Sequence, residues 1–149
     1  MQTINTNNLN QARKQIQKLK RENKEIVIQA QDNKFNRKIL ENPDINILLS
    51  PELHDRKDKL KQRDSGLNEV LCKLAKQNNI KIGIDLNKIN KLEKKQKAII
   101  LARIIQNINL CKRTKTQIIL FPKNKFKKQD VLGFFLTLNG STEQAKQAV

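Results

Sequence analysis

The stretch from Asp64 to Leu86, DSGLNEVLCKLAKQNNIKIGIDL, decides the fold of this chain. Its first half carries apolar residues at steps of three and four, which predicts a helix over about residues 66–78 with Asp64 or Ser65 as its N-cap. Two asparagines end that helix, and the β-branched run that follows predicts a strand over residues 80–86. A helix followed directly by a strand is typical of a parallel β/α fold.

The same alternation of helix and strand continues in both directions along the chain. Apolar periodicity predicts further helices over residues 9–23, 33–40, 92–114, 129–138 and 141–149. Short β-branched runs predict strands over residues 25–30, 45–49 and 117–121. Strands separated by helices pair in parallel through right-handed crossovers. We therefore expect one α/β domain over residues 1–149, with about four parallel strands and six to seven helices.

The charge of the chain points to a polyanionic partner. Lys and Arg total 31 against 14 Asp and Glu, which gives a formal charge of +17 in 149 residues. Such an excess repels itself in the compact state unless a polyanion is bound, and nucleic acid is the usual one. Compositional drift is the alternative, since 24 Lys, 18 Ile and 18 Asn suit a genome rich in A and T. The charge favours nucleic acid and leaves both explanations open.

Targeting and redox signals indicate a cytoplasmic protein. No segment reaches the ~18 apolar residues that a membrane-spanning helix needs. The polar start MQTINTNNLNQ lacks the apolar core of a signal peptide. Cys72 and Cys111 lie in apolar stretches without CxxC spacing, so we expect buried free thiols in a reducing compartment.

The segment SPELHDRKDKLKQRD, residues 50–64, gathers groups that could carry chemistry. Carboxylates beside a histidine could hold a divalent metal for phosphoester hydrolysis; here they are Glu52, His54, Asp55, Asp58 and Asp64. Their spacing matches no metal motif, and five cations among them oppose a metal. The sequence also contains no GxxxxGK[ST], GxGxxG or GxSxG. We therefore expect no catalytic residue and no metal ligand in this chain.

Basic residues near the strand ends are the candidate contacts to RNA or to a partner. A loop that follows a parallel strand lies at the carboxyl edge of the sheet, where such folds bind ligands, although a solvated charged loop is the alternative. Asp64-Ser65-Gly66 could hold an anion as well as cap a helix. Phe126, among lysines, is either a core anchor or a stacking platform for a base. The candidates are Arg56, Lys57, Arg63, Asp64, Ser65, Gly66, Lys112, Arg113, Lys125 and Lys127.

The run RKDKLKQRDSGLNEVLCKLAKQNNIKIGIDL resembles the signature of protein component 3 of archaeal ribonuclease P, a TIM-barrel-like subunit. The counterparts of the family's motifs are SPEL at residues 50–53, RDSGLN at 63–68 and IKIGIDL at 80–86, and the block from SGLN to GIDL is the specific part. NKFNRKILENPDINILLSPE upstream, and RIIQNINLCKRTKTQIIL and DVLGFFLTLNGSTEQAKQAV downstream, are similar to further stretches of the family in the same order. The resemblance thus covers nearly the whole chain.

The chain also departs from the family pattern. It begins at what corresponds to the third helix, so the one or two strand–helix pairs that open the family's chain have no counterpart here. Four strands cannot close an eight-stranded barrel, and the resemblance therefore implies a partial or open TIM-barrel-like fold. The loop before Asp64 carries extra residues, 54–62, and the loop after Phe121 is shorter than usual.

The resemblance implies a subunit of the ribonuclease P ribonucleoprotein, which removes 5′ leaders from precursor tRNA. The RNA component would perform the hydrolysis with Mg²⁺, and this chain would bind no cofactor and would not be catalytic alone. It would bind and stabilise the catalytic RNA beside precursor tRNA and other protein subunits, notably the component 2 type. Two alternatives stay open: a metal-dependent phosphoesterase or nuclease on a related β/α barrel, and a non-catalytic RNA-binding protein.

Overall fold

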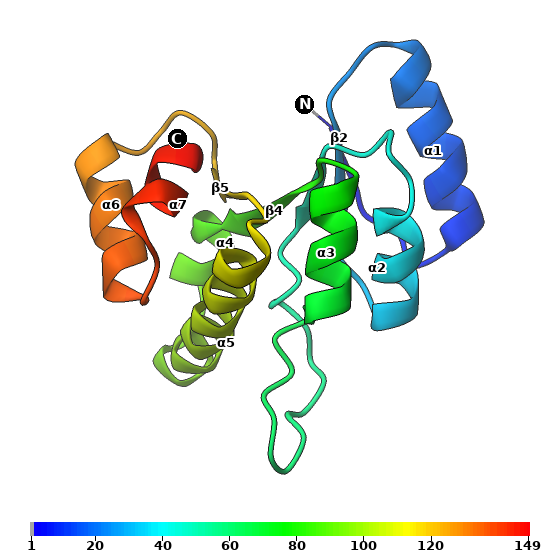
Figure 1. Cartoon of the computed structure of the whole chain (residues 1–149). Helices are drawn as coiled ribbons and strands as arrows, with labels where there is room; N and C mark the ends of the chain where they lie inside the picture. The colour runs from blue at the N-terminus through cyan, green and yellow to red at the C-terminus, as the bar shows by residue number, and fades with distance from the viewer. Residues whose placement is uncertain (1) are drawn as a thin grey trace.

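The computed structural model describes residues 2–149 and shows a parallel sheet with helices packed against it (Figure 1). In this part of the chain five strands follow one another across the sheet in sequence order, and every pairing is parallel. The strands are β1 (Gln2–Ile4), β2 (Ile26–Gln29), β3 (Ile47–Leu49), β4 (Lys81–Asp85) and β5 (Ile118–Phe121). This order confirms the open, TIM-barrel-like parallel β/α fold.

Helices connect every pair of neighbouring strands. Over residues 2–149 they are α1 (Leu9–Arg21), α2 (Asn33–Leu40), α3 (Glu69–Gln77), α4 (Leu86–Asn90), α5 (Lys94–Thr114), α6 (Lys128–Thr137) and α7 (Thr142–Gln147). Side chains cap several of their starts: Asn8 accepts backbone N–H groups of α1, Asp32 does so for α2, and Ser141 forms a capping box with Gln144 at α7. These caps satisfy N–H groups that no helical bond reaches, so the helix starts are specified locally by the sequence.

The sheet has one strand more than the four expected, because β1 is not visible in the apolar pattern. Gln2 and Thr3 are exposed and only Ile4 is buried. The strand is defined by its pairing with β2, in which Ile4 lies opposite Ile28. A three-residue edge strand with one apolar side chain carries no periodic signal, so only the partner strand reveals it.

Apolar side chains lie on both faces of the sheet. The larger cluster, between sheet and helices, includes Ile16, Ile28, Leu48, Ile82 and Ile104. A smaller cluster on the opposite face consists of Val27, Ile47, Leu49, Ile119 and Phe121. Gly83 on the intervening β4 makes room for it, since a Cβ there would lie 2.9 Å from Leu49 Cδ1 and 3.1 Å from the Phe121 ring.

Two other expectations concern the thiols and the membrane. Cys72 of α3 and Cys111 of α5 are both free and buried, as expected. Within residues 2–149 no helix combines the length and the apolar character needed to cross a membrane.

Candidate functional site

The long segment between β3 and α3 is the main irregular feature at the carboxyl edge of the sheet. It leaves β3 at Ser50, whose φ of 53° turns the chain sharply, and it reaches α3 at Asn68. Figure 1 shows it extending away from the sheet beside α5 as a narrow loop. The carboxyl ends of parallel strands are where β/α folds bind their ligands, so this segment is positioned for contact with a partner.

Arg103 of α5 holds the first arm of this loop. The Arg103 side chain is 6% exposed. Its Nη1 donates to the carbonyl oxygens of Glu52 at 3.0 Å and His54 at 2.9 Å, and its Nη2 donates to that of Arg56 at 3.0 Å. A planar guanidinium presents several donors in a fixed fork, which suits a series of backbone carbonyls. The loop therefore has a defined path without regular secondary structure.

His54 joins the two arms of the loop. Its Nδ1 accepts the backbone N–H of Arg56 at 3.1 Å, and its Nε2 donates to the carbonyl oxygen of Asp64 at 2.8 Å. Because a carbonyl oxygen only accepts, this arrangement requires a neutral imidazole with its proton on Nε2. Burial lowers the pKa of His54 below its ordinary value of 6.5, and the nearby cations Arg103 and Arg56 lower it further.

The carboxylates of Asp64 and Asp58 form ion pairs with arginines inside the loop. Arg56 Nε donates to Asp64 Oδ2 at 3.1 Å, while Asp58 lies 3.8 Å from the guanidinium nitrogens of both Arg63 and Arg103. Partial burial raises the pKa of Asp64, but hydrogen bonds from Arg56 and the Gly66 amide outweigh it, so the pKa lies below its ordinary value. These carboxylates are therefore held by cations. No cluster of three or more possible metal ligands occurs within residues 2–149.

The Asp64-Ser65-Gly66 motif does not cap α3, so that prediction is wrong. Asn68 is the N-cap, with its side chain accepting the Leu71 N–H at 2.9 Å. Asp64 instead accepts the Gly66 N–H at 3.1 Å, within the turn that precedes the helix. The residues of the motif form this turn, and α3 begins only at Glu69.

A fully buried carboxyl group lies below the loop. Apart from its own backbone amide, the Glu52 carboxyl has no hydrogen-bond donor among the described residues. Burial raises its pKa to about 7, the Asp85 carboxylate adds to the rise, and Arg103 and Lys88 oppose it. Lys88 Nζ itself donates to Gln29 Oε1 at 3.1 Å, which places a polar group from β2 beside the first residues of α4.

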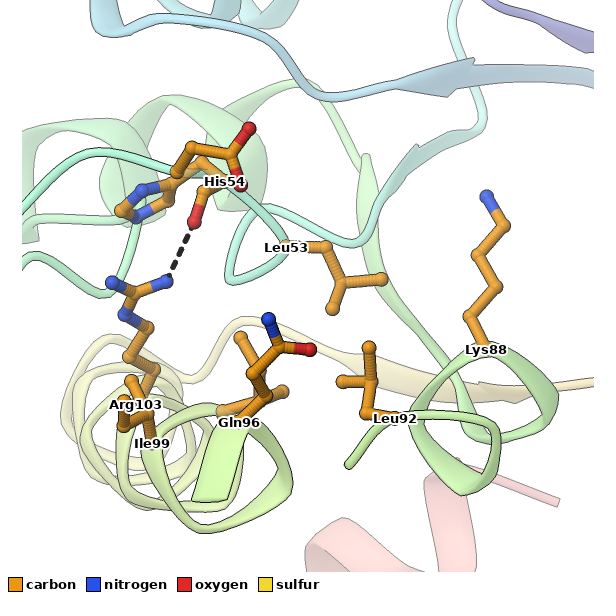
Figure 2. Close-up of a pocket in the computed structure, with 9 residues that line it drawn as sticks. Leu53, His54, Lys88, Leu92, Gln96, Ile99 and Arg103 are labelled. Atoms are coloured by element: carbon orange, nitrogen blue, oxygen red, sulfur yellow. Dashed lines mark hydrogen bonds between the residues drawn. The ribbon is translucent and has the colours of Figure 1, made fainter. Parts of the chain in front are cut away.

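A cavity of about 480 Å³ opens beside the base of the loop (Figure 2). Leu53 and His54 line it from the loop, and Leu92, Ile99 and Arg103 line it from the α4–α5 region. Figure 2 shows the hydrogen bond from the Arg103 guanidinium to the His54 carbonyl oxygen on one side of the cavity. Leu53 and Leu92 face each other on the other side. Four aliphatic side chains line the cavity together with five polar or charged ones, among them Asp55, Lys88 and Gln96. A mixed lining of this kind is typical of a binding cleft, and the lining residues include no Ser, Thr, Cys or Lys beside a hydrogen-bonded base.

The structure separates the candidate basic residues into two regions. Lys125 and Lys127 are exposed after β5 and share the carboxyl edge with the β3–α3 loop. Lys112 and Arg113 are exposed in the last turn of α5, which leads into β5, so they lie at the opposite, amino edge. Phe126 is partly buried against the main core, which favours the core-anchor interpretation.

Within the loop the candidates also differ in what they touch. Arg56 and Arg63 form ion pairs with Asp64 and Asp58, and Ser65 and Gly66 are buried. Lys57 is exposed and has no ion pair among the residues that the structure describes. The sequence reasoning missed Arg103 and Asn107, whose side chains hold the loop. Their signal was present: an arginine and an asparagine four residues apart on the buried face of an apolar helix, where a charged side chain survives only if it is paired.

Fold and loop together define a class, an open parallel β/α-barrel chain with a cationic loop at the carboxyl edge of its sheet. No protein-family model matches the chain. It is 31% identical over 117 residues to ribonuclease P protein component 3 of Methanococcus vannielii, and 27% identical over 117 residues to the protein of that name from Methanococcus maripaludis strain C7. Both alignments cover 78% of this chain and 48% and 47% of the relatives, so the chain spans about half of their length.

A solved structure shares the fold. A chain of the cryo-EM structure of archaeal ribonuclease P with mature tRNA superimposes with a TM-score of 0.77 and 24% identity, over 97% of this chain and 62% of that one. The resemblance to ribonuclease P protein component 3 is confirmed over 117 residues of this chain, and the solved structure shows the same fold.

Proposed function

We propose that this chain is a protein subunit of a ribonuclease P ribonucleoprotein, the endoribonuclease that removes 5′ leaders from precursor tRNA. The observation that carries the proposal is the homology to ribonuclease P protein component 3, which extends over 78% of the chain. In this proposal the RNA component performs the hydrolysis with its own Mg²⁺, and the protein binds and stabilises that RNA.

The chemistry of the candidate site supports a role without catalysis by this chain. Asp58 and Asp64 are paired with arginines, and His54 uses both ring nitrogens for backbone hydrogen bonds. A general base needs a free lone pair within reach of a substrate proton, and a metal site needs carboxylates that are not already neutralised. These groups maintain the shape of the loop, which favours a scaffolding function over a phosphoesterase.

The exposed cations supply the proposed contact with RNA. The net charge is +17, and the exposed Lys57, Lys125 and Lys127 follow strands at the carboxyl edge of the sheet. Lys112 and Arg113 form a second basic region at the amino edge. Phosphate contacts by such side chains supply much of the affinity for nucleic acid and make it dependent on salt.

The proposal also concerns the protein partners of this chain and its location in the cell. We infer that other ribonuclease P protein subunits, among them one of the component 2 type, bind this chain in the particle. The cavity beside Leu53 and Ile99, with Ile99 48% exposed, offers an apolar surface for such a contact. We also propose a cytoplasmic location, consistent with precursor tRNA as the substrate and with the free thiols of Cys72 and Cys111.

Reconstitution tests the proposal directly. Precursor tRNA, the catalytic RNA and the remaining protein subunits are combined with and without this chain, and the appearance of the 5′ leader is followed with Mg²⁺ present. We expect the chain to raise the cleavage rate or to lower the Mg²⁺ requirement, and to cleave nothing alone. If its omission leaves both unchanged, the proposal fails. Cleavage by the chain alone, abolished by His54→Ala, would favour the phosphoesterase alternative.

A further inference from the structure

Residues 54–65 of the β3–α3 loop, here called the basic finger, form an ordered projection with an unusual tip. Lys59 and Gln62 make an antiparallel bridge, and the Gln62 N–H donates to the Lys59 carbonyl at 3.2 Å, so Leu60 and Lys61 form a tight turn. The Leu60 side chain is completely exposed, at 106% of its reference area. Figure 1 shows the loop reaching beyond the ends of α3 and α5.

The base of the basic finger is clamped from both sides. Arg103 binds the carbonyls of its first arm, and Asn107 Nδ2 donates to the Ser65 carbonyl at 3.0 Å at the end of its second arm. Across the two arms, the Asp64 N–H donates to Asp58 Oδ1 at 2.7 Å. A projection held in one shape loses little conformational entropy on binding, which is the property of a preorganised contact.

The cationic side chains of the basic finger are of two kinds, arginines that form ion pairs with aspartates and lysines that form none within residues 2–149. Arg56 forms an ion pair with Asp64, and Arg63 forms one with Asp58. Lys57, Lys59 and Lys61 are exposed and have no carboxylate within ion-pair distance in the described part of the chain. The internal pairs therefore shape the finger and leave three ammonium groups around one apolar side chain. A hollow of about 550 Å³ lies between this tip and Gln106 of α5.

We propose that the basic finger inserts into the RNA partner, with Lys57, Lys59 and Lys61 on phosphates and Leu60 packed against an unstacked base. This inference rests on the proposed function and assigns it a contact element. Protein interfaces are depleted in lysine and bury clustered aromatic and apolar anchors, whereas Leu60 stands alone between two lysines. Nucleic acids favour the opposite combination, phosphate-binding cations beside an apolar wedge that enters a base step.

Salt-dependent binding of the full chain to transcribed ribonuclease P RNA from Methanococcus vannielii tests the cations. For Lys59→Ala with Lys61→Ala, the slope of log affinity against log salt should shrink by about 1.4 to 1.8, which corresponds to two phosphates. The matched control, Lys14→Ala with Lys18→Ala on the exposed face of α1, should keep the wild-type slope. Equal slopes in all three proteins, or an equal loss in the control, would overturn the proposal.

A crosslink tests the tip. Leu60→Cys, labelled with an azidophenacyl group, provides a selective probe because Cys72 and Cys111 are buried. In the reconstituted particle we expect the label to attach to RNA, and Leu60→Ala to weaken RNA binding about threefold to tenfold without changing the salt slope. Attachment only to another protein subunit overturns the RNA assignment.

The two proposals fail in different ways. If the finger variants bind RNA and support cleavage as the wild type does, the finger is dispensable and the subunit function stands. If the wild-type chain neither binds the RNA nor affects the reconstituted reaction, the proposed function fails.

Discussion

The α-carbon of Gly66 packs against the carbonyl oxygen of Pro51, so that a Cβ at position 66 would lie only 1.9 Å from that oxygen. Gly66 also has a φ of 82°, a conformation that other residues adopt at a cost. This contact joins the two ends of the β3–α3 loop. Glycine in the SGLN block is thus required by the close approach of the backbone, and the residue contributes to the shape of the site rather than to its chemistry.

Gly66→Ala should therefore destabilise the chain severely. Backbone strain and overpacking together predict a loss of about 3 kcal/mol or more in the free energy of unfolding, measured by urea titration with circular dichroism. Gly133→Ala is the matched control, because this glycine lies inside α6 and a Cβ added there would meet no atom within 4 Å apart from its chain neighbours and the backbone of its own helix. The control should gain about 1 kcal/mol from helix propensity. Equal stability of the two variants would contradict this explanation.

Asn68→Ala should weaken α3 through loss of its N-cap. The Asn68 side chain accepts the Leu71 N–H at 2.9 Å, and removal of such a cap costs about 1 kcal/mol. Asn68→Asp should retain most of the stability, because aspartate caps equally well. Thermal unfolding of the three proteins checks the assignment, and an unchanged midpoint for Asn68→Ala would return the capping role to Asp64 or Ser65.

Arg103→Lys should loosen the basic finger although it keeps the charge. Lysine cannot reach three carbonyl oxygens with one fork of donors, so the Glu52, His54 and Arg56 carbonyls lose partners. We expect a loss of about 2 to 4 kcal/mol in stability and faster amide exchange in residues 54–65. Arg113→Lys, exposed on the same helix, should change neither. Unchanged exchange in the finger of Arg103→Lys would show that other contacts hold it.

Glu52 should make stability fall as pH rises. Its pKa is raised in the folded chain from an ordinary value of 4.5 to about 7, so the folded state binds the proton more tightly than the unfolded state between these values. Its stabilising contribution is complete below the unfolded pKa and is lost as pH rises through the folded pKa, with a total of about 3 kcal/mol. Glu52→Gln should remove this dependence.

Urea unfolding of wild type and Glu52→Gln from about pH 5 to about pH 8 measures the effect as the difference between the two proteins. That difference isolates Glu52, since His54 and the other titrating groups are present in both. A difference that stays constant over this range would mean that the Glu52 carboxylate has a partner when ionised.

Much of the fold can be predicted from local patterns. The helix over residues 33–40 and the strand ends around residues 25–30 and 117–121 are placed within one or two residues, because apolar periodicity and capping side chains specify them locally. β1 and the short α4 cannot be predicted from such patterns. β1 contributes one buried side chain, and α4 is a five-residue turn that follows β4 directly, capped by Asp85.

The candidate site is less predictable, because its cations look alike in the sequence. The sequence predicts RNA or partner contacts for Arg56, Lys57 and Arg63 alike, whereas the structure pairs Arg56 with Asp64 and Arg63 with Asp58 and shows no ion pair for Lys57 within residues 2–149. Lys59 and Lys61 are also exposed, and the sequence pattern does not single them out. Which cations are free depends on the folding of the loop upon itself, which local pattern does not report.

By itself the sequence determined the alternation of helix and strand, the excess of positive charge and the resemblance carried by the SGLN block. These features depend on neighbouring residues or on composition, so they can be read without coordinates. The tertiary structure alone decided how the β3–α3 loop is held. Arg103 reaches carbonyls about fifty residues away in the chain, such as that of Glu52 at a separation of 51. Hydrogen bonds over such a separation exist only after the sheet and α5 have packed together, and they turn a charged loop into a defined surface.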